Sequence, residues 1–78
     1  MFYTYVLKST VDSKLYIGFT NNLKKRLEEY NIGKVNSTKD RKPLILIHYE
    51  ACLGENKAIK REKYFKTGFG RIFLRDRI

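Results

Sequence analysis

Cysteine and histidine are nearly absent from this sequence of 78 residues, and long apolar runs are absent altogether. The single cysteine, Cys52, excludes an internal disulfide framework, and one cysteine with one histidine is too few for a zinc site. No apolar run approaches the roughly 18–20 residues of a membrane span. The N-terminus alternates polar and apolar residues and lacks the layout of a secretory signal. We therefore expect a cytoplasmic protein that does not insert into a membrane.

Acidic residues are also few, and this shortage gives the chain its strongest compositional signal. Seventeen Lys and Arg stand against eight Asp and Glu, which leaves a formal net charge of +9. Because such an excess repels itself within a folded domain, it predicts a polyanionic partner, with nucleic acid favoured. A ribosome-adjacent or merely very soluble basic protein is the alternative that charge alone leaves open.

The alternation of residue types predicts three strands. Residues 2–8 and 15–20 are rich in Tyr, Thr and aliphatic side chains, and a turn at 11–14 joins them into one tight hairpin. Residues 44–50 form a continuous apolar run, which is typical of a strand buried on both faces. Gly18 within the second strand marks either a bulge or a close backbone approach.

The spacing of apolar residues predicts three helices. The first is capped by Asn21 or Asn22 and ends at Gly33. The second follows the third strand and ends at Gly68, and a short third helix comes after it. Residues 1–78 therefore form one α+β domain of order ββαβαα, a small three-stranded sheet flanked by helices.

Tyr5 and Tyr16 are the first candidates for chemistry. The predicted turn places residue 5 opposite the stretch 18–20 and one pair away from residue 16, so both phenols can face one cleft. A phenol with a pKa near 10 is a poor base at neutral pH unless cations or a metal-bound water lower that pKa. Nearby Lys and Arg can do so. The alternative is that these strand tyrosines simply pack, with their hydroxyls at the surface.

Arg26 and Tyr30 are the second pair of candidates, because they lie four residues apart and are adjacent on the first helix. Arg26 borders the buried stripe of that helix. A half-shielded guanidinium grips phosphate oxygens and stabilises charge that develops in a transition state. The alternatives are a snorkelling arginine or an ion pair with Glu29.

Glu62 is the sharpest anomaly in the second helix. It lies on the apolar seam between Ala58 and Phe65, in a helix that otherwise carries lysines and arginine outside. Burying a carboxylate is costly unless it is paired or holds a cation. One carboxylate with several waters is a usual way to hold Mg²⁺ beside a phosphate. A salt bridge to Arg26 or to a neighbouring lysine is the alternative.

Basic residues of the first helix and of the polar stretch 34–42, which we expect to be a mobile loop, are candidates for phosphate contacts. These residues are Lys24, Lys34, Lys39, Arg41 and Lys42. The alternative is a charge run that is only solvated.

Two short motifs, together with several flanking segments, resemble the GIY-YIG nuclease domain. Tyr16-Ile17-Gly18 matches the second signature triplet intact, and Tyr3-Thr4-Tyr5 stands where the first triplet falls, without its Gly and Ile. The whole chain is similar to the small stand-alone bacterial members of that superfamily. The other matching segments are 20–27, 30–34, 42–44 and 61–63.

The resemblance implies Mg²⁺-dependent, or Mn²⁺-dependent, hydrolysis of phosphodiester bonds in DNA. It assigns Tyr5 and Tyr16 to orienting and deprotonating the attacking water, and Arg26 to stabilising phosphorane-like charge. Glu62 holds the metal in this assignment, and Tyr30 contacts the leaving side.

Two departures from the family pattern bear on function. Many catalytic members place an Asn after the metal-binding glutamate, and none occurs in residues 63–78. Relatives usually attach the module to a separate DNA-binding domain, so affinity is here expected from the chain's own charge, a protein partner or homodimerisation. Our first hypothesis is an endonuclease for branched, damaged or single-stranded DNA. The alternatives are a non-catalytic nucleic-acid-binding module and a subunit that is activated only inside a repair complex.

Overall fold

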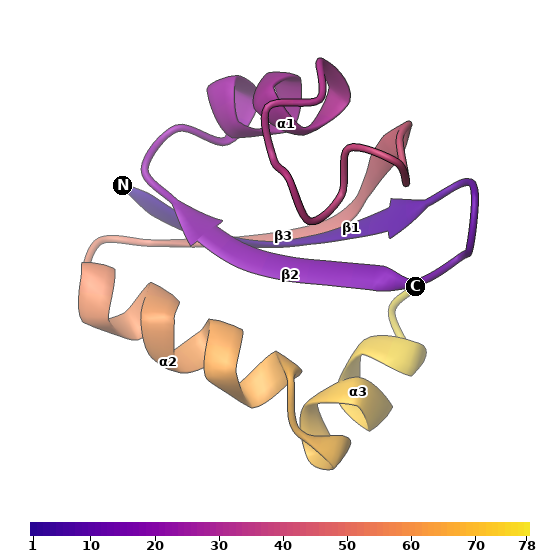
Figure 1. Ribbon diagram of the computed structural model, residues 1–78. Helices are drawn as coiled ribbons and strands as arrows, with labels where there is room; N and C mark the ends of the chain where they lie inside the picture. The colour runs from indigo at the N-terminus through magenta and orange to yellow at the C-terminus, as the bar shows by residue number, and fades with distance from the viewer.

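A computed structural model describes all 78 residues and shows three strands and three helices in the order ββαβαα (Figure 1). The elements are β1 (Phe2–Ser9), β2 (Leu15–Thr20), α1 (Leu23–Asn31), β3 (Leu44–Cys52), α2 (Glu55–Phe65) and α3 (Gly68–Arg75). This arrangement confirms the predicted α+β fold with a three-stranded sheet. None of the helices is long and apolar enough to cross a membrane.

The central strand of the sheet is β1, which pairs antiparallel with β2 on one side and β3 on the other. Tyr5 lies opposite Gly18, and Leu7 lies opposite Tyr16, as the predicted turn requires. The β1–β2 pairing runs through Gly18 without a shift, while the only shift in register lies on the β3 side. Gly18 is therefore a site of close approach and not a bulge.

The third strand corrects one prediction. Its apolar run predicts burial on both faces, yet β3 is an edge strand, and Ile45 and Tyr49 are 51% and 52% exposed. The doubly buried strand is β1, in which residues 4–7 are each exposed by 2% or less. The prediction failed because burial depends on the order of strands in the sheet, which the residue pattern of one strand does not contain.

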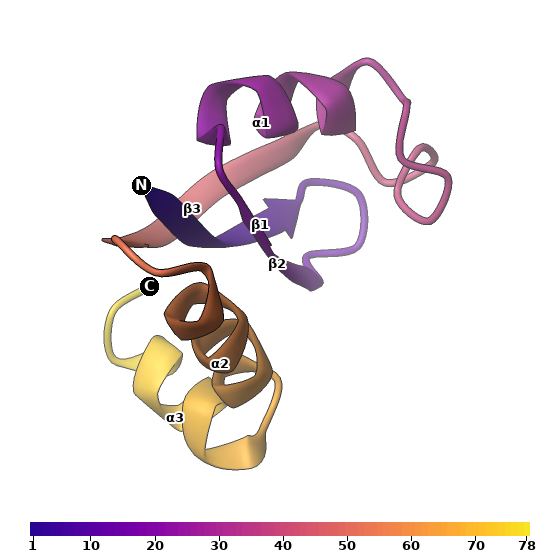
Figure 2. The ribbon, with the colours of Figure 1, turned by 90° about the vertical axis from the view of Figure 1, so that its left-hand side faces the viewer.

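The helices cover the two faces of the sheet separately, with α1 on one side and α2 and α3 on the other (Figure 2). One core cluster joins α1 to Tyr5 and Leu7, and the other joins α2 and α3 to Val6. Successive residues of β1 thus serve opposite faces, as the period of a strand requires. A site that uses residues from both α1 and α2 must therefore lie at an edge of the sheet.

The helix ends agree with the sequence except at Gly68. The Asn22 side chain accepts a hydrogen bond from the N–H of Lys25, and Gly33 follows α1 with a positive φ of 82°. We expected Gly68 to end the second helix, but α2 ends at Phe65 and Gly68 is the first residue of α3. The reason is Thr67, whose side chain caps α3 by accepting the N–H of Gly70 at 3.1 Å.

A side chain at Gly18 would collide with Tyr5. A Cβ there would lie 2.7 Å from Cζ of Tyr5 and would overlap its hydroxyl oxygen. We expect Gly18→Ala to displace the ring and lower the free energy of unfolding by about 1–3 kcal/mol, as overpacking does. Urea denaturation measures this loss. Gly68→Ala is the matched control, because no atom lies within 4 Å of a Cβ there and alanine favours helix. An unchanged midpoint for Gly18→Ala would show that the ring does not lie over β2.

Candidate active site

Three of the predicted site residues meet on the α1 face of the sheet: Tyr5, Arg26 and Tyr30, called here the arginine–tyrosine cluster. The hydroxyls of Tyr5 and Tyr30 are 3.0 Å apart, and Nε of Arg26 donates to the Tyr5 hydroxyl at 3.4 Å. The guanidinium carbon also lies 4.9 Å from the centroid of the Tyr30 ring. Because Arg26 and Tyr30 are one turn apart on α1, the helix presents both to Tyr5 at once.

The missing side chain of Gly18 permits this convergence. The ring of Tyr5 reaches from β1 across the backbone of Gly18 in β2, where any Cβ would overlap it. Its hydroxyl therefore lies over the edge strand rather than over the middle of the sheet. The second triplet, Tyr16-Ile17-Gly18, thus ends in glycine because a side chain there would collide with Tyr5 of the first triplet.

Arg26 is half-shielded, as its position beside the apolar stripe predicts. Its side chain is 37% exposed, and Nη1 lies 3.2 Å from Oε1 of Glu29. The ion pair considered as an alternative is therefore present together with the contact to Tyr5. The hydrogen bond with Tyr5 is the largest cause of the raised pKa of Arg26, so the group stays charged. A guanidinium has five N–H donors, and those not engaged here can bind phosphate oxygens.

Burial raises the pKa of the Tyr5 phenol well above its ordinary value, and the hydrogen bond with Tyr30 raises it further. Arg26 lowers the pKa by hydrogen bonding and charge, but by less than burial raises it. The expectation that nearby cations make this phenol more acidic is therefore wrong for Tyr5, which is only 2% exposed. Tyr5 is a neutral hydrogen-bonding group at physiological pH.

This shift predicts a pH dependence of stability. A group whose pKa is raised on folding stabilises the native state below its unfolded pKa, about 10 for tyrosine, and loses that contribution as pH rises further. Wild type should therefore lose stability above about pH 10, and Tyr5→Phe should lose less. Phenolate absorbance compared between the two proteins isolates Tyr5 among the six tyrosines. If the difference in phenolate absorbance between wild type and Tyr5→Phe were half complete near pH 10, the raised pKa of Tyr5 would be contradicted.

Tyr16 lies on the same face of the sheet as Tyr5 and packs against the same core cluster. It is half-buried, and its hydroxyl donates to Oδ2 of Asp12 at 3.4 Å. The sequence interpretation missed Asp12, which also accepts the N–H of Lys14 and pairs with Arg41 at 2.9 Å. Its only sequence signal was an aspartate in a turn, a position that suits backbone hydrogen bonding.

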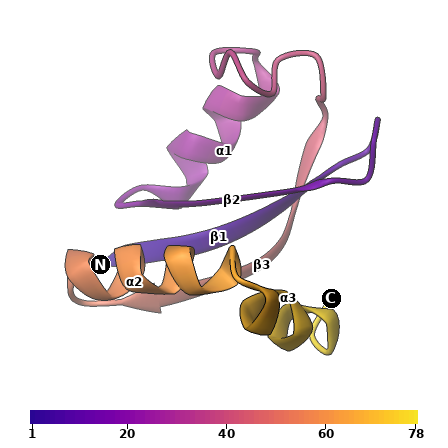
Figure 3. The same cartoon turned by 60° about the horizontal axis from the view of Figure 1, so that its bottom comes forward.

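Glu62 lies on α2 and therefore across the sheet from the arginine–tyrosine cluster (Figure 3). Its side chain is 18% exposed, and its carboxylate lies 3.1 Å from Nζ of Lys66, the neighbouring lysine considered as an alternative. The preceding residue, Arg61, points to β3, where it binds Glu50. Because successive helical residues are turned by about 100°, Glu62 lies on the other flank of α2, toward β2. The cluster and the carboxylate thus flank the same edge strand from opposite faces.

The donor set around Glu62 fits a divalent cation only as a one-carboxylate site. No group of three or more His, Cys, Asp or Glu side chains lies close enough together to hold a metal ion. Mg²⁺ commonly binds through one or two carboxylates, keeps several waters and takes substrate phosphate oxygens. Glu62 meets this description, since its carboxylate is partly exposed and its partner Lys66 is 53% exposed and able to move away.

The basic residues proposed for phosphate contacts lie on α1 and in the segment between α1 and β3. Lys24, Lys34, Lys39 and Lys42 are exposed. The segment was expected to be a mobile loop, but it packs against the β1–β2 turn. Ser9 Oγ donates to the carbonyl of Arg41 at 2.6 Å, and the Arg41 guanidinium pairs with Asp12. Arg41 is therefore partly neutralised by an acid of the same chain.

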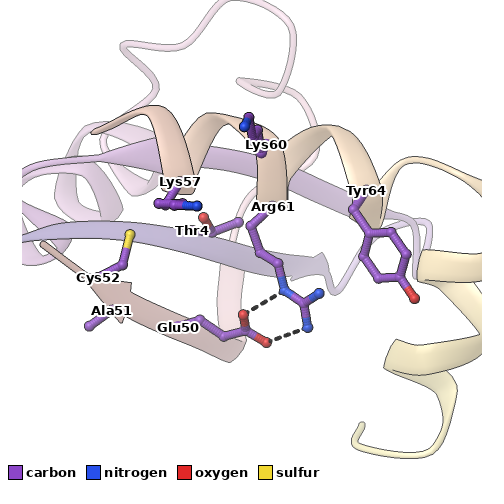
Figure 4. A pocket seen from close by; sticks show the side chains of 8 residues that line it. All are labelled: Thr4, Glu50, Ala51, Cys52, Lys57, Lys60, Arg61 and Tyr64. Atoms are coloured by element: carbon purple, nitrogen blue, oxygen red, sulfur yellow. Dashed lines mark hydrogen bonds and ion pairs between the residues drawn. The ribbon is translucent and has the colours of Figure 1, made fainter. Parts of the chain in front are cut away.

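A second group of charged residues lies in a hollow of about 450 Å³ between α2 and the end of β3 (Figure 4). Arg61 binds both carboxylate oxygens of Glu50, at 2.7 and 3.2 Å. Burial raises the pKa of Glu50, but the hydrogen bonds and charges of Arg61 and His48 together hold it below its usual range. The sequence did not indicate this pairing, because packing alone brings the two residues together. The Arg61–Glu50 pair fixes which flank of α2 faces β3. Because Glu62 follows Arg61 in the helix, the same pair fixes Glu62 on the other flank.

The structure is thus a small α+β domain in which tyrosines from two paired strands share the face of the sheet that carries a helix arginine. The family model described as the GIY-YIG catalytic domain matches residues 1–74. The chain therefore belongs to the GIY-YIG family, and the resemblance seen in the sequence is confirmed. Members of this family are generally endonucleases, so membership implies a nuclease-like activity and DNA as the partner.

Curated relatives show the same similarity over most of the chain. A UPF0213 protein of Syntrophus aciditrophicus is 41% identical over 66 residues, which are 82% of this chain and 75% of the relative. A UPF0213 protein of Bacillus pumilus is 42% identical over 66 residues, 83% of this chain and 66% of the relative. A UPF0213 protein of Staphylococcus haemolyticus is 36% identical and is covered over 79% of its length. No solved structure matches this chain.

Proposed function

We propose that this chain is a divalent-metal-dependent endonuclease that hydrolyses DNA phosphodiester bonds in the cytoplasm, selecting structure more than sequence. The observation that carries the proposal is the arginine–tyrosine cluster over Gly18 of the edge strand. It places a charged, half-shielded guanidinium against a buried phenol, on the opposite face of the sheet from the helix that carries Glu62. Family membership supplies the class of reaction.

Each residue has a role that its surroundings support. Arg26 binds the scissile phosphate and stabilises the charge that builds up on it. Tyr5 is neutral and orients the attacking water through its hydroxyl, with Tyr30 holding that hydroxyl in place and lying toward the leaving side. Tyr16 takes the water proton as its own hydroxyl proton passes to the Asp12 carboxylate, to which that hydroxyl donates a hydrogen bond.

Glu62 would hold Mg²⁺ or Mn²⁺, which supplies Lewis-acid stabilisation and an activated water when bound. Lys24, Lys34, Lys39, Arg41 and Lys42 would contact the DNA backbone. These contacts carry no sequence information by themselves, which is why we propose weak sequence selectivity.

The experiment is a cleavage assay on plasmid and branched DNA with Mg²⁺, comparing wild type with Glu62→Ala and Arg26→Ala. Wild type should nick the DNA and both variants should not.

The second candidate function is a catalytically weak or inactive nucleic-acid-binding module, favoured by the Glu62–Lys66 pair and the raised pKa of Tyr5. If wild type and both variants bind DNA without cutting it, and their affinity falls steeply with salt, the binding function is established instead. Activity that appears only with a companion recovered from lysate would indicate a subunit of a repair complex.

The Tyr16→Phe variant separates chemistry from folding. Its hydroxyl contributes one long hydrogen bond to a partly exposed acid, so thermal melting should be almost unchanged. Cleavage should fall by roughly 10²–10⁴-fold, the range that general acid–base groups contribute. A collapse of the melting temperature would instead make the hydroxyl structural.

A further inference from the structure

A second hollow, of about 520 Å³, opens on the α1 side of the sheet near the start of α1. Tyr3 and Tyr49 form one wall, with ring centroids 6.2 Å apart and planes tilted by 58°. Lys24 and the amides of Asn21 and Asn22 line its rim. None of these residues except Lys24 has a role in the nuclease proposal.

The tyrosine pair joins the central strand β1, which carries Tyr3, to the edge strand β3, which carries Tyr49. Tyr49 is 52% exposed, so an aromatic face is available to a ligand without any rearrangement of the core. Rings of this kind stack on nucleic acid bases, whatever the base, because every base has a π face. The wall therefore suits a flat aromatic group that enters from solvent.

The rim supplies the polar contacts that such a group needs. The Asn22 side-chain oxygen is occupied by the N–H of Lys25, which leaves its NH₂ group as a donor. Asn21 beside it is exposed and offers both a donor and an acceptor. Lys24 adds a cation within reach of a phosphate. The aromatic wall suits the base of one nucleotide, the amides suit its polar edge, and the single cation suits its phosphate.

The hollow lies beside the candidate active site, on the other flank of α1. Tyr3 precedes Tyr5 by two residues and shares its face of β1, about 7 Å away along the strand. Tyr49 is the β3 partner of Tyr5. Leu23 and Leu27 of α1 border the hollow, whereas Arg26 reaches the Tyr5 hydroxyl, which lies over Gly18. A strand that crosses the first turn of α1 can therefore reach both places.

We propose that this hollow binds one unpaired base of a DNA strand whose backbone is cut at the candidate active site. The inference rests on the proposed function and names its substrate class: DNA with a single-stranded or branched segment. A paired base is stacked within a duplex and cannot enter, so the hollow would discriminate by base accessibility rather than by sequence. The requirement for an accessible base is thus the physical source of the proposed structure selectivity.

The test uses a single-stranded oligonucleotide carrying 2-aminopurine, bound by the full chain in EDTA so that no cleavage occurs. Stacking on Tyr49 and Tyr3 should quench the 2-aminopurine fluorescence. Tyr49→Leu keeps bulk but removes the π face, and it should weaken single-strand binding roughly ten- to hundredfold while leaving duplex binding unchanged. Phe69→Ala removes a 79% exposed ring on α3 and is the matched control. It should change neither quenching nor affinity.

Three results would overturn the proposal. The first is binding with no quenching, and the second is an equal loss of affinity in Phe69→Ala. The third is displacement of the oligonucleotide by a mononucleotide at equal concentration, which would make the ligand a free nucleotide.

Sedimentation of wild type and Tyr49→Leu adds a check, since a dimer lost in the variant would show that a second copy covers the hollow. Wild-type cleavage without quenching would refute the base site alone, and quenching without cleavage with Mg²⁺ would refute the nuclease alone.

Discussion

Replacing Glu62 by glutamine should abolish metal-dependent cleavage while leaving the fold intact. The substitution keeps the size of the side chain but removes the only acid proposed to hold the cation. Lewis-acid stabilisation is worth several kcal/mol, which at tenfold per 1.36 kcal/mol corresponds to at least about a thousandfold loss of rate. Stability should change by less than about 1 kcal/mol, since the pair with Lys66 is a partly exposed pair one turn apart. Nicking rates at saturating Mg²⁺ and thermal melts measure the two effects.

Glu55→Gln is the control for this variant, because it makes the same chemical change in the exposed first turn of the same helix. It should cut DNA at the wild-type rate. If Glu62→Gln retained more than about a tenth of the wild-type rate, Glu62 would not be the metal ligand.

Exchanging Arg26 for lysine should also remove most of the activity. Lysine keeps the positive charge but loses the planar fork that binds two phosphate oxygens and contacts Tyr5. Removal of one transition-state donor costs about 10²–10³-fold in kcat, and we expect a loss in that range with substrate affinity little changed. Single-turnover cleavage at saturating enzyme separates the chemical step from binding.

Glu29→Gln is the control here, because it removes the ion pair of Arg26 and leaves the guanidinium in place. Its activity should equal or exceed that of wild type. A loss in Glu29→Gln as large as that in Arg26→Lys would mean that the ion pair positions α1 and that Arg26 has no contact with substrate.

The hairpin and its register could be predicted from the sequence because they are local. A turn at 11–14 fixes which residues of two short strands face each other, and the period of two then puts Tyr5, Gly18 and Tyr16 on one face. The pairing of Arg26 with Tyr30 is local too, being one turn of a helix. These relations need no knowledge of the rest of the fold.

The remaining features depend on packing between distant segments. The pKa of Tyr5 is raised by burial under α1, and burial is a tertiary property that no strand pattern states. The edge position of β3 depends on strand order. The hollow at Tyr3 and Tyr49 depends on the β1–β3 register, which joins residues 35 to 50 positions apart. Such relations become visible only when the chain is folded.

Paramagnetic line broadening by Mn²⁺ tests most directly whether both faces serve one site at the edge of β2. In isotope-labelled protein, Mn²⁺ bound at Glu62 should broaden the amide signals of Gly18 and Tyr16 and the Nε–H signal of Arg26 more than the amides of β3. Addition of an uncleavable phosphorothioate strand should strengthen this pattern. Broadening confined to α2 and α3, with Gly18 and Arg26 still sharp, would show that the carboxylate and the arginine–tyrosine cluster do not share a site.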